Sequence, residues 1–417
     1  MQCMKILLIN PNRFLFPPVP PLGLEYLSAS LVKAGHDIRL LDLTFHKNAE
    51  AVIDEVLSGF RPDISGVTVR NIDSVLYHDN EFYLDSIRDI VRHLKIRHGL
   101  KVVIGGAGIM VNPEGVLEYL SADYAIAGPA EGIINELLAA VSSGQAMKKV
   151  WKGFFQPYSS CSRITSAIDY QKYYASGGIA GFETHKGCSS SCVYCIEADS
   201  PVAFKRAEDV IQEIRGFVES GYSHFHLCDA EFNEDLDLAI EFCSVLRREN
   251  MNMQWALYMK PANYNQKLFS LMKKTGVNLI TLTIDSFRKC PLYWSDTEKI
   301  IFNAQANGIR IAVDFLTGFP YEDIDLLKWC LDFFRRLQPH RVNINTFIRL
   351  YKPLMITKII ERDEACKTYI LGNRDNKAMI LPIFYNQIDP ELLKELVSDD
   401  RIFNIEGHEK GVNYMRS

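Results

Sequence analysis

The sequence lacks several features that would assign it to whole classes of protein. Its 417 residues carry a net charge of −5, so there is no excess of Lys and Arg of the kind that binds nucleic acids. No apolar run reaches the roughly 18–20 residues that span a bilayer. The opening residues, MQCMKILLINPN, also lack the long apolar stretch and the small-residue cleavage site of a signal peptide. We therefore expect a cytoplasmic protein with no nucleic-acid partner and no membrane span.

Two common nucleotide-binding signatures are also missing. No G-x-G-x-x-G follows the first apolar run, which disfavours a dinucleotide site. No G-x-x-x-x-G-K-[ST] occurs, which excludes a P-loop. What remains is an ordinary globular composition with 47% apolar residues. At roughly 100–200 residues per domain, the length predicts two or three packed domains.

The first 150 residues alternate short apolar runs with amphipathic segments of helical spacing. This alternation predicts a doubly wound, Rossmann-like parallel sheet of α/β class. The expected strands are residues 4–10, 38–43, 63–69, 101–106 and 123–128. Ligands in such sheets bind beyond the carboxyl ends of the strands. These ends are residues 10–12, 69–73, 105–108 and 128–131.

Three of the ten cysteines form a close group, Cys188-x3-Cys192-x2-Cys195. A zinc site normally has four ligands, often as two separated pairs, and no second C-x-x-C exists in the chain. Three thiolates on one loop fit an iron–sulfur cluster that keeps one coordination position open. The other seven cysteines stand singly, and we expect them to be small buried apolar side chains in a reducing compartment.

Strand and helix patterns resume after a break at residues 151–178, which we interpret as a linker. Residues 179–350 contain further strand–helix repeats, which predict a partial β/α barrel with its chemistry at the carboxyl ends of the strands. Residues 351–417 form a less regular C-terminal region. The expected barrel strands after the cysteine group are residues 224–233, 253–259, 278–286, 309–320 and 341–350.

Two stretches together carry a family resemblance. The cysteine spacing, with Tyr194 before the third Cys, is the signature of radical S-adenosylmethionine (SAM) enzymes. The string PPVPPLGLEYLSASLVKAGHDIRLLDL resembles the opening of the cobalamin-binding domain that some of these enzymes carry. The chain resembles this family over about residues 4–390, and its methyltransferase branch, which includes tryptophan and natural-product methyltransferases, in particular. The resemblance implies three cofactors: a 4Fe–4S cluster, SAM and cobalamin.

The resemblance also assigns residues to these cofactors. Cys188, Cys192 and Cys195 would hold the cluster. Glu231, in the string DAEFN, would bind the SAM amino group. Asp285 and Ser286 would contact its ribose, although they could equally be a helix N-cap pair. Gly318 would form the turn against adenine. The turns with Gly105, Gly106, Gly128 and Glu131 would contact cobalamin, with Arg70 and Asn71 near cobalt; the alternative for Arg70 is a strand-end cap or a pair with Asp73.

Two departures from the family pattern affect the expectations. No D-x-H-x-x-G motif occurs, so we expect cobalamin to bind without a protein histidine on cobalt. Tyr351-Lys352-Pro353-Leu354 replaces the usual Pro-Gly-Thr turn after the sixth barrel strand. The string PIFY resembles a segment that covers the barrel mouth, which would place Phe384 and Tyr385 near the substrate unless they are core aromatics. Arg70 and Tyr385 are the catalytic candidates.

The function implied is C-methylation of a small metabolite. A 5′-deoxyadenosyl radical would abstract a substrate hydrogen, and methylcobalamin would donate the methyl group. The partners implied are a small-molecule substrate and an external electron donor of flavodoxin or ferredoxin type. We expect the substrate to be an uncharged or zwitterionic natural-product intermediate. Two alternatives stay open: a radical SAM enzyme of dehydration, cyclisation or rearrangement type that does not use cobalamin, and a non-catalytic cobalamin- or cluster-binding regulator.

Overall fold

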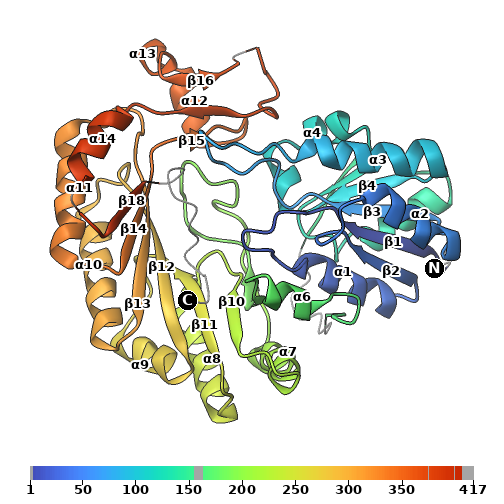
Figure 1. Cartoon of the computed structure of the whole chain (residues 1–417), viewed down its shortest axis with the longest axis horizontal. Coiled ribbons are helices and arrows are strands. Elements are labelled where there is room, and N and C mark those ends of the chain that lie inside the picture. Colours follow the sequence, from blue (N-terminus) through green and yellow to red (C-terminus); the bar gives the residue numbers. More distant parts are fainter. Residues whose placement is uncertain (1–2, 155–162, 374, 399, 406–417) are drawn as a thin grey trace.

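The computed structural model describes residues 3–154, 163–373, 375–398 and 400–405. Two large parallel sheets lie side by side, each covered by helices (Figure 1). The elements of the first unit are β1 Lys5–Asn10, α1 Leu22–Lys33, β2 Asp37–Asp42, α2 Ala49–Gly59, β3 Ile64–Thr68, α3 Leu84–His98, β4 Val102–Gly105, the 3-10 helix η1 Ala107–Val111, α4 Pro113–Leu120, β5 Tyr124–Ala127, α5 Ile134–Ser142 and β6 Val150–Lys152.

The N-terminal sheet has six parallel strands in the order β2-β1-β3-β4-β5-β6. Helices cover both faces of this sheet, so the side chains of its central strands are apolar on both faces. One apolar core beneath α2, α3 and α4 lies on one face, and a second beneath α1 and α5 lies on the other. The doubly wound α/β fold expected from the alternation is confirmed.

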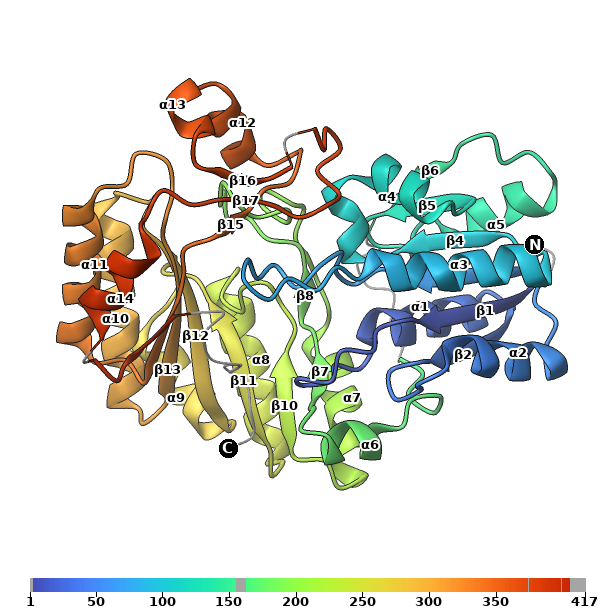
Figure 2. The ribbon, with the colours of Figure 1, turned by 45° about the horizontal axis from the view of Figure 1, so that its top comes forward.

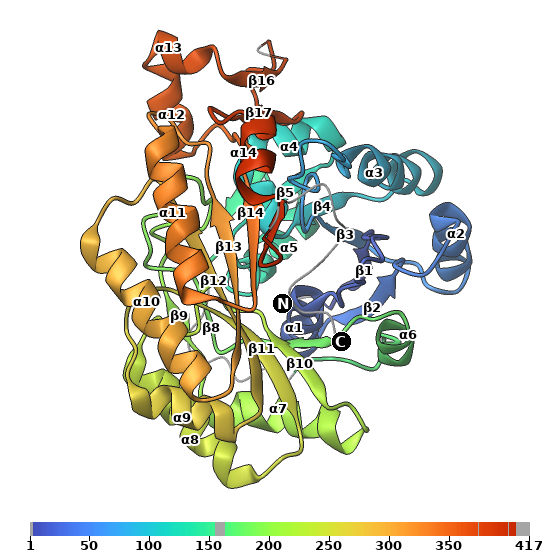
Figure 3. The same cartoon turned by 60° about the vertical axis from the view of Figure 1, so that its left-hand side comes forward.

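The second sheet is the partial barrel, with seven parallel strands in the order β18-β14-β13-β12-β11-β10-β7. Outward side chains such as Ile280, Leu282 and Ile284 are fully buried beneath the helices. Figure 3 shows these helices along the outer face. The elements are α6 Tyr170–Ala175, β7 Ala180–Phe182, β8 His185–Lys186, β9 Ala203–Phe204, α7 Ala207–Glu219, β10 His224–Leu227, α8 Leu236–Glu249, β11 Gln254–Met259, α9 Gln266–Lys274, β12 Val277–Asp285, α10 Pro291–Ala306, β13 Arg310–Leu316, α11 Ile324–Leu337, β14 Arg341–Asn345 and β18 Phe403–Ile405.

Most of the C-terminal region, residues 348–385, lies above the carboxyl ends of the barrel strands (Figure 2), whereas Leu393 and Val397 join the apolar core of the barrel. It contains a three-stranded antiparallel sheet in the order β15-β17-β16. Tyr194, in the cysteine loop, packs against its apolar cluster, and the backbone N–H of Ile356 donates to the Val193 carbonyl at 2.9 Å. The cysteine loop is therefore covered by this region. The elements are β15 Ile348–Arg349, α12 Met355–Glu361, α13 Glu364–Lys367, β16 Ile370–Gly372, β17 Ile383–Tyr385 and α14 Pro390–Val397.

Three details differ from the sequence-based expectations. The expected linker begins inside β6, which pairs with β5 as the last strand of the first sheet. Strand β18 adds a seventh barrel strand from the far end of the chain. Among the described single cysteines, Cys243, Cys330 and Cys366 are buried as expected, whereas Cys3, Cys228 and Cys290 are exposed. Cys161 lies outside the described residues. No helix in the described ranges is long and apolar enough to cross a membrane.

Candidate functional site

The cysteine group lies on one loop between β8 and β9. The loop is closed by its own backbone: the Cys195 N–H donates to the Cys192 carbonyl at 3.1 Å, and the Ser200 N–H donates to the Cys188 carbonyl at 3.0 Å. The Cys188 N–H in turn donates to the Ser200 hydroxyl at 2.8 Å. These contacts hold the three predicted ligands in one short segment at the carboxyl end of the barrel.

The surroundings of the three thiols fit a cationic cluster. Burial raises the pKa of each thiol, that of Cys195 to about 11, so their thiolate forms need positive charge nearby. The guanidinium Nη2 of Arg288 lies 2.9 Å from the Cys192 sulfur. The three sulfur atoms are not gathered around one point: in the described ranges, the only set of three ligand atoms all within 4.8 Å lies elsewhere, at Asp54, His93 and His98.

Glu231 follows β10 and carries a buried carboxylate oxygen, Oε2, with no hydrogen-bond partner in the described part of the chain. Burial raises the pKa of Glu231 to about 8, although the nearby Lys260 opposes the shift. Lys260 itself is engaged elsewhere, because its ammonium lies 2.8 Å from the Glu234 carboxylate. A buried, unpartnered carboxylate is suited to bind a ligand ammonium group, as the family resemblance implies for Glu231.

Asp285 ends β12 beside the cysteine loop, and Ser286 follows it. Asp285 accepts hydrogen bonds from the Arg288 N–H at 3.0 Å and from the Tyr194 hydroxyl at 3.4 Å. Burial raises the pKa of Asp285 to about 6, and Arg288 opposes this shift. The pair does not cap helix α10, whose N-cap residue is Cys290. The ribose contact assigned to these two residues stays a prediction.

Gly318 lies in the turn after β13 and needs to be glycine. Its φ of +86° is in the left-handed region, and a Cβ there would lie 2.4 Å from the Thr346 carbonyl oxygen. The buried Glu322 carboxylate accepts from the Gly318 N–H at 2.7 Å and from the Phe319 N–H at 3.0 Å. The turn is therefore fixed at the carboxyl edge of the barrel, where the resemblance places the adenine contact.

The glycine turns of the N-terminal sheet bring its strand-end loops into direct backbone contact. Gly106 has a φ of +104°, and a Cβ there would lie 2.6 Å from the Val69 carbonyl oxygen. Gly128 has a φ of +99° and packs against Gly153 in the same way; Gly105 ends β4. Glu131 forms an ion pair with Lys186 of β8 at 3.1 Å, so this predicted cobalamin residue contacts the other domain.

The loop between β3 and α3, residues 69–83, extends from the N-terminal sheet towards the barrel (Figure 2). The buried Asp73 carboxylate lies 2.8 Å from the guanidinium of Arg349, at the carboxyl side of the barrel. Tyr77 stacks on Phe347 with ring centroids 4.3 Å apart. Both contacts bind the loop to the C-terminal half of the molecule.

Arg70 and Asn71 are exposed at the start of this loop. The alternative pairing of Arg70 with Asp73 is not formed in the described structure, because Asp73 pairs with Arg349. The charge of Arg70 adds to the larger effect of burial in lowering the pKa of His226, on β10, to about 4. Arg70 therefore lies close enough to the barrel for its charge to act on β10. Its role beside cobalt stays a prediction.

The two aromatic residues assigned to the barrel mouth have different surroundings. Phe384 contacts Tyr77 of the β3–α3 loop, with ring centroids 5.4 Å apart. Tyr385 is completely buried in the apolar cluster of the C-terminal region, and its hydroxyl donates to Gln387 at 2.9 Å. Its catalytic assignment stays a prediction that this geometry does not favour. Tyr351 lies beneath the Arg349 guanidinium at 4.5 Å.

Comparisons with known proteins match both halves of the chain. A model of the B12 binding domain matches residues 16–138, and a model of the radical SAM superfamily matches residues 182–334. Tryptophan 2-C-methyltransferase of Streptomyces laurentii is 22% identical, with 89% of this chain and 77% of that protein aligned. Cytidylyl-2-hydroxyethylphosphonate methyltransferase of Streptomyces wedmorensis is 23% identical over 76% of this chain and 73% of its own.

A solved structure shares the whole fold. The radical SAM methyltransferase TsrM of Kitasatospora setae, determined with tryptophan substrate and a SAM analogue bound, superposes with a TM-score of 0.84 at 22% identity, covering 99% of this chain and 93% of that one. The two family models match in the same order as the two sheets, and the cysteine loop lies inside the second. The chain therefore belongs to the radical SAM enzymes that carry an N-terminal B12-binding domain, a family whose cofactors are a 4Fe–4S cluster, SAM and cobalamin.

Proposed function

We propose that the protein C-methylates a small polar metabolite with all three family cofactors. The observation that carries this proposal is the buried Asp73–Arg349 ion pair, whose side chains are 0% and 2% exposed. This ion pair joins the loop after β3, which lies at the expected ligand-binding edge of the N-terminal sheet, to the carboxyl side of the barrel. A methyl group held at the first edge must come into near contact with a carbon activated at the second. The relatives named above, both methyltransferases, support this reaction.

The cofactors supply the reactive chemistry when bound: SAM on the reduced cluster is the source of the carbon-centred radical, and cobalamin carries the methyl group. The residues of the chain supply placement. Cys188, Cys192 and Cys195 hold the cluster, and Glu231 binds the SAM ammonium group. The turn at Gly318 presents backbone to adenine. The C-terminal region covers the cysteine loop and excludes water from it.

The inward side chains of the barrel support a small polar substrate. They alternate with the outward apolar set along each strand. Tyr258 and Asn343 both donate to Asp314, at 3.4 and 2.8 Å. The inward positions of the central strands carry two carboxylates, Asp314 and Asp285, and small or apolar side chains such as Ala256, Leu279 and Ala312. The other polar groups at inward positions are His226, Tyr258, Thr281, Thr283, Asn343 and Asn345. A lining of this kind matches an uncharged or zwitterionic metabolite better than a polyanion. We include natural-product intermediates and an external flavodoxin- or ferredoxin-type electron donor in the proposal.

The test is product analysis with the full-length, anaerobically reconstituted protein, cobalamin, SAM and a low-potential reductant. Tryptophan and a panel of polar metabolites serve as probes, with SAM carrying a deuterated methyl group. We expect a deuteromethylated product with S-adenosylhomocysteine and 5′-deoxyadenosine formed in step with it. Release of 5′-deoxyadenosine with an unmethylated product would support dehydration, cyclisation or rearrangement instead. SAM consumption coupled only to RNA or to a folded protein would overturn the substrate class.

The mode of cobalamin binding is a separate part of the proposal. The strand-end segments 10–12, 105–108 and 128–131 contain no histidine. We expect the electron paramagnetic resonance spectrum of bound cob(II)alamin to be identical in unlabelled protein and in protein labelled with 15N-histidine. A change in nitrogen superhyperfine splitting upon labelling would show a protein imidazole on cobalt and contradict this expectation.

A further inference from the structure

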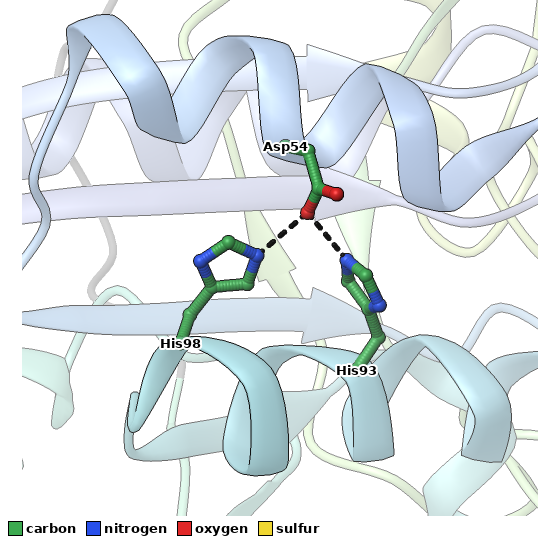
Figure 4. A group of neighbouring side chains, drawn as sticks. All are labelled: Asp54, His93 and His98. Carbon is green, nitrogen blue, oxygen red and sulfur yellow. Dashed lines mark hydrogen bonds and ion pairs between the residues drawn. The ribbon is translucent and has the colours of Figure 1, made fainter.

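A second group of potential metal ligands lies on the outer face of the N-terminal domain (Figure 4). Asp54 lies on α2, and His93 and His98 lie on α3. The Oδ1 atom of Asp54 is 2.7 Å from Nε2 of His93 and 2.7 Å from Nε2 of His98. In Figure 1 these helices lie at the end of the molecule remote from the barrel, so the group is separate from the cysteine loop.

The helix positions follow from the packing of α2 and α3 on one face of the sheet. Ile53 and Leu94 are fully buried beneath the two helices, in the core they share. Asp54 and His93 are the immediate neighbours of these residues, so both lie at the seam between the helices. His98 is the last residue of α3 and precedes Gly99, whose left-handed φ of +66° ends the helix. The seam therefore directs the three side chains towards one point.

The donor set has the composition of a transition-metal site. Two imidazole nitrogens and one carboxylate oxygen are ligands shared by Zn²⁺, Co²⁺ and Ni²⁺ sites. The three ligand atoms all lie within 4.8 Å of one another, the only such group in the described ranges. Metal bonds of about 2.0–2.2 Å need ligand atoms slightly further apart than these hydrogen-bond distances. The side chains are 8%, 22% and 32% exposed for His93, His98 and Asp54, which leaves room for this small opening and for entry of an ion.

Among the neighbours of the group, Glu50 and the end of α3 favour a bound cation, whereas the charge of Arg97 opposes one. Glu50 lies 3.7 Å from the far ring nitrogen of His93, Nδ1, and a carboxylate there favours the tautomer that leaves Nε2 free to ligate. Arg97 lies 3.2 Å from the other carboxylate oxygen of Asp54, Oδ2, so Oδ1 remains directed at the imidazoles. The C-terminal end of α3 adds the negative end of its helix dipole.

We propose that Asp54, His93 and His98 form a binding site for one divalent transition-metal ion, such as Zn²⁺, which ties α2 to α3. The site is independent of the cluster and of the proposed methyl transfer. The competing explanation is that Asp54 simply accepts two imidazole N–H hydrogen bonds as a contact between helices. The two explanations make opposite predictions for metal content, because hydrogen bonding alone binds no ion.

The test uses the full-length protein with its cluster reconstituted, dialysed to equilibrium against ZnCl2 alone. We expect one zinc per chain, and an X-ray absorption spectrum at the zinc edge with only nitrogen and oxygen in the first shell. The variants His93→Ala, His98→Ala and Asp54→Asn should each weaken zinc binding by at least tenfold. Zinc should raise the melting temperature of the wild type but not of these variants. Binding should also weaken in acid, because protons compete for the imidazoles.

His340→Ala is the matched control, because His340 is an exposed histidine of the barrel domain. It should retain the zinc content and the thermal shift of the wild type. Circular dichroism identifies variants that fail to fold, and the near-isosteric Asp54→Asn keeps the test valid if an alanine variant does so. Sulfur in the zinc shell, zinc content unchanged in all three variants, or no zinc in the folded wild type would overturn the proposal.

Discussion

The two parallel sheets end in strand edges that differ in how their polar groups are used. At the N-terminal sheet, the Asp42 carboxylate accepts hydrogen bonds from Asn10, Thr44 and Tyr173. Glu131 and Asp73 are likewise engaged, by Lys186 and by Arg349. At the barrel, one carboxylate oxygen of Glu231 is buried without a partner in the described structure, and one loop carries three cysteines, of which Cys188 is buried and Cys192 and Cys195 are half-buried.

The polar groups with a partner in the protein stabilise the fold, whereas the groups without one are candidates to bind a ligand. Burying a polar group without a partner costs free energy, and natural proteins retain such groups chiefly where a ligand completes them. The satisfied residues at the N-terminal edge therefore fix the geometry of the domains. The unsatisfied ones at the barrel edge mark where SAM and the cluster bind in the proposed function. The predictions below test that division, from the largest expected effect to the smallest.

The largest effect should come from the cysteine loop. Replacing Cys188, Cys192 and Cys195 together with Ala removes every predicted thiolate ligand of the cluster. We expect the visible iron–sulfur absorption and nearly all protein-bound iron to be lost, with the fold retained by circular dichroism. The matched control is a triple variant of the isolated cysteines Cys243, Cys330 and Cys366, each changed to Ala. Iron bound in full by the Cys188–Cys195 variant would contradict the assignment.

The next largest effect should come from the pair that joins the domains. Arg349→Ala leaves the Asp73 carboxylate buried and unpaired, and breaking a buried ion pair in this way costs about 3–5 kcal/mol. We expect a corresponding decrease in the free energy of unfolding, measured by chemical denaturation. The double variant Arg349→Met/Asp73→Leu should recover part of it, because it removes both charges but leaves the Leu350 and Ile380 carbonyls without the donor that Arg349 supplies. A single variant as stable as the wild type would show that the pair does not hold the loop.

Glu231→Gln tests the unpartnered carboxylate. A hydrogen bond to a charged group contributes about 1.5–3 kcal/mol, so SAM should bind the variant roughly 10–100 times more weakly. In the wild type, the pKa of about 8 keeps Glu231 protonated below that pH, and binding an ammonium requires loss of this proton. SAM affinity should therefore rise from pH 6 to about 8. It should fall above that pH because α-amino groups lose their proton near 8.

Isothermal titration calorimetry across this pH range checks both parts of the prediction. Glu231→Gln should lose the rising limb and keep the falling one. Glu241→Gln is a control, because Glu241 is an exposed carboxylate on α8. A variant with unchanged affinity and an unchanged pH profile would remove Glu231 from the SAM site.

A smaller effect is expected at Arg288, whose guanidinium contacts the Cys192 sulfur. A cationic donor stabilises the more negative, reduced state of the cluster. Arg288→Gln should therefore shift the midpoint potential to more negative values, by tens of millivolts, since a tenfold change in a one-electron equilibrium is about 59 mV. Redox titration followed by electron paramagnetic resonance measures this shift, with Arg336→Gln as a surface control. A more positive potential would contradict the electrostatic role.

The smallest effect is expected at Tyr385, which lies among satisfied groups. Tyr385→Phe removes only the hydrogen bond to Gln387, so stability should fall by about 1 kcal/mol and turnover should persist. The unfolding free energy and the rate of SAM consumption check this. Loss of more than tenfold in turnover without loss of the fold would instead restore the catalytic role that the sequence suggested.

The sequence predicted those features that depend on local pattern. A buried strand such as β1 can be recognised from a short run of apolar residues, and the structure confirms it. The cysteine group can likewise be recognised from its spacing, and the structure places its three residues on one loop. Strand β18 is only three residues long and carries no distinct periodicity, which is why the seventh barrel strand was not expected. The Asp73–Arg349 pair joins residues 276 positions apart, and nothing in a single sequence links them. The one available signal was an arginine inside the apolar run FIRL.

The position of β18 has a consequence for how this molecule is made and how it diversifies. Strands β14 and β18 are neighbours in the barrel, yet the whole C-terminal region lies between them in the chain. The region is thus an insertion anchored at both ends in the most regular part of the fold. The ribosome must release residues 341–405 before β14 and β18 can pair, so the cover over the cysteine loop is synthesised before this edge of the barrel closes. An insertion that is anchored at both ends can change in length and sequence while β14 and β18 stay paired. Substrate specificity can therefore diverge in this region while the barrel strands are unchanged.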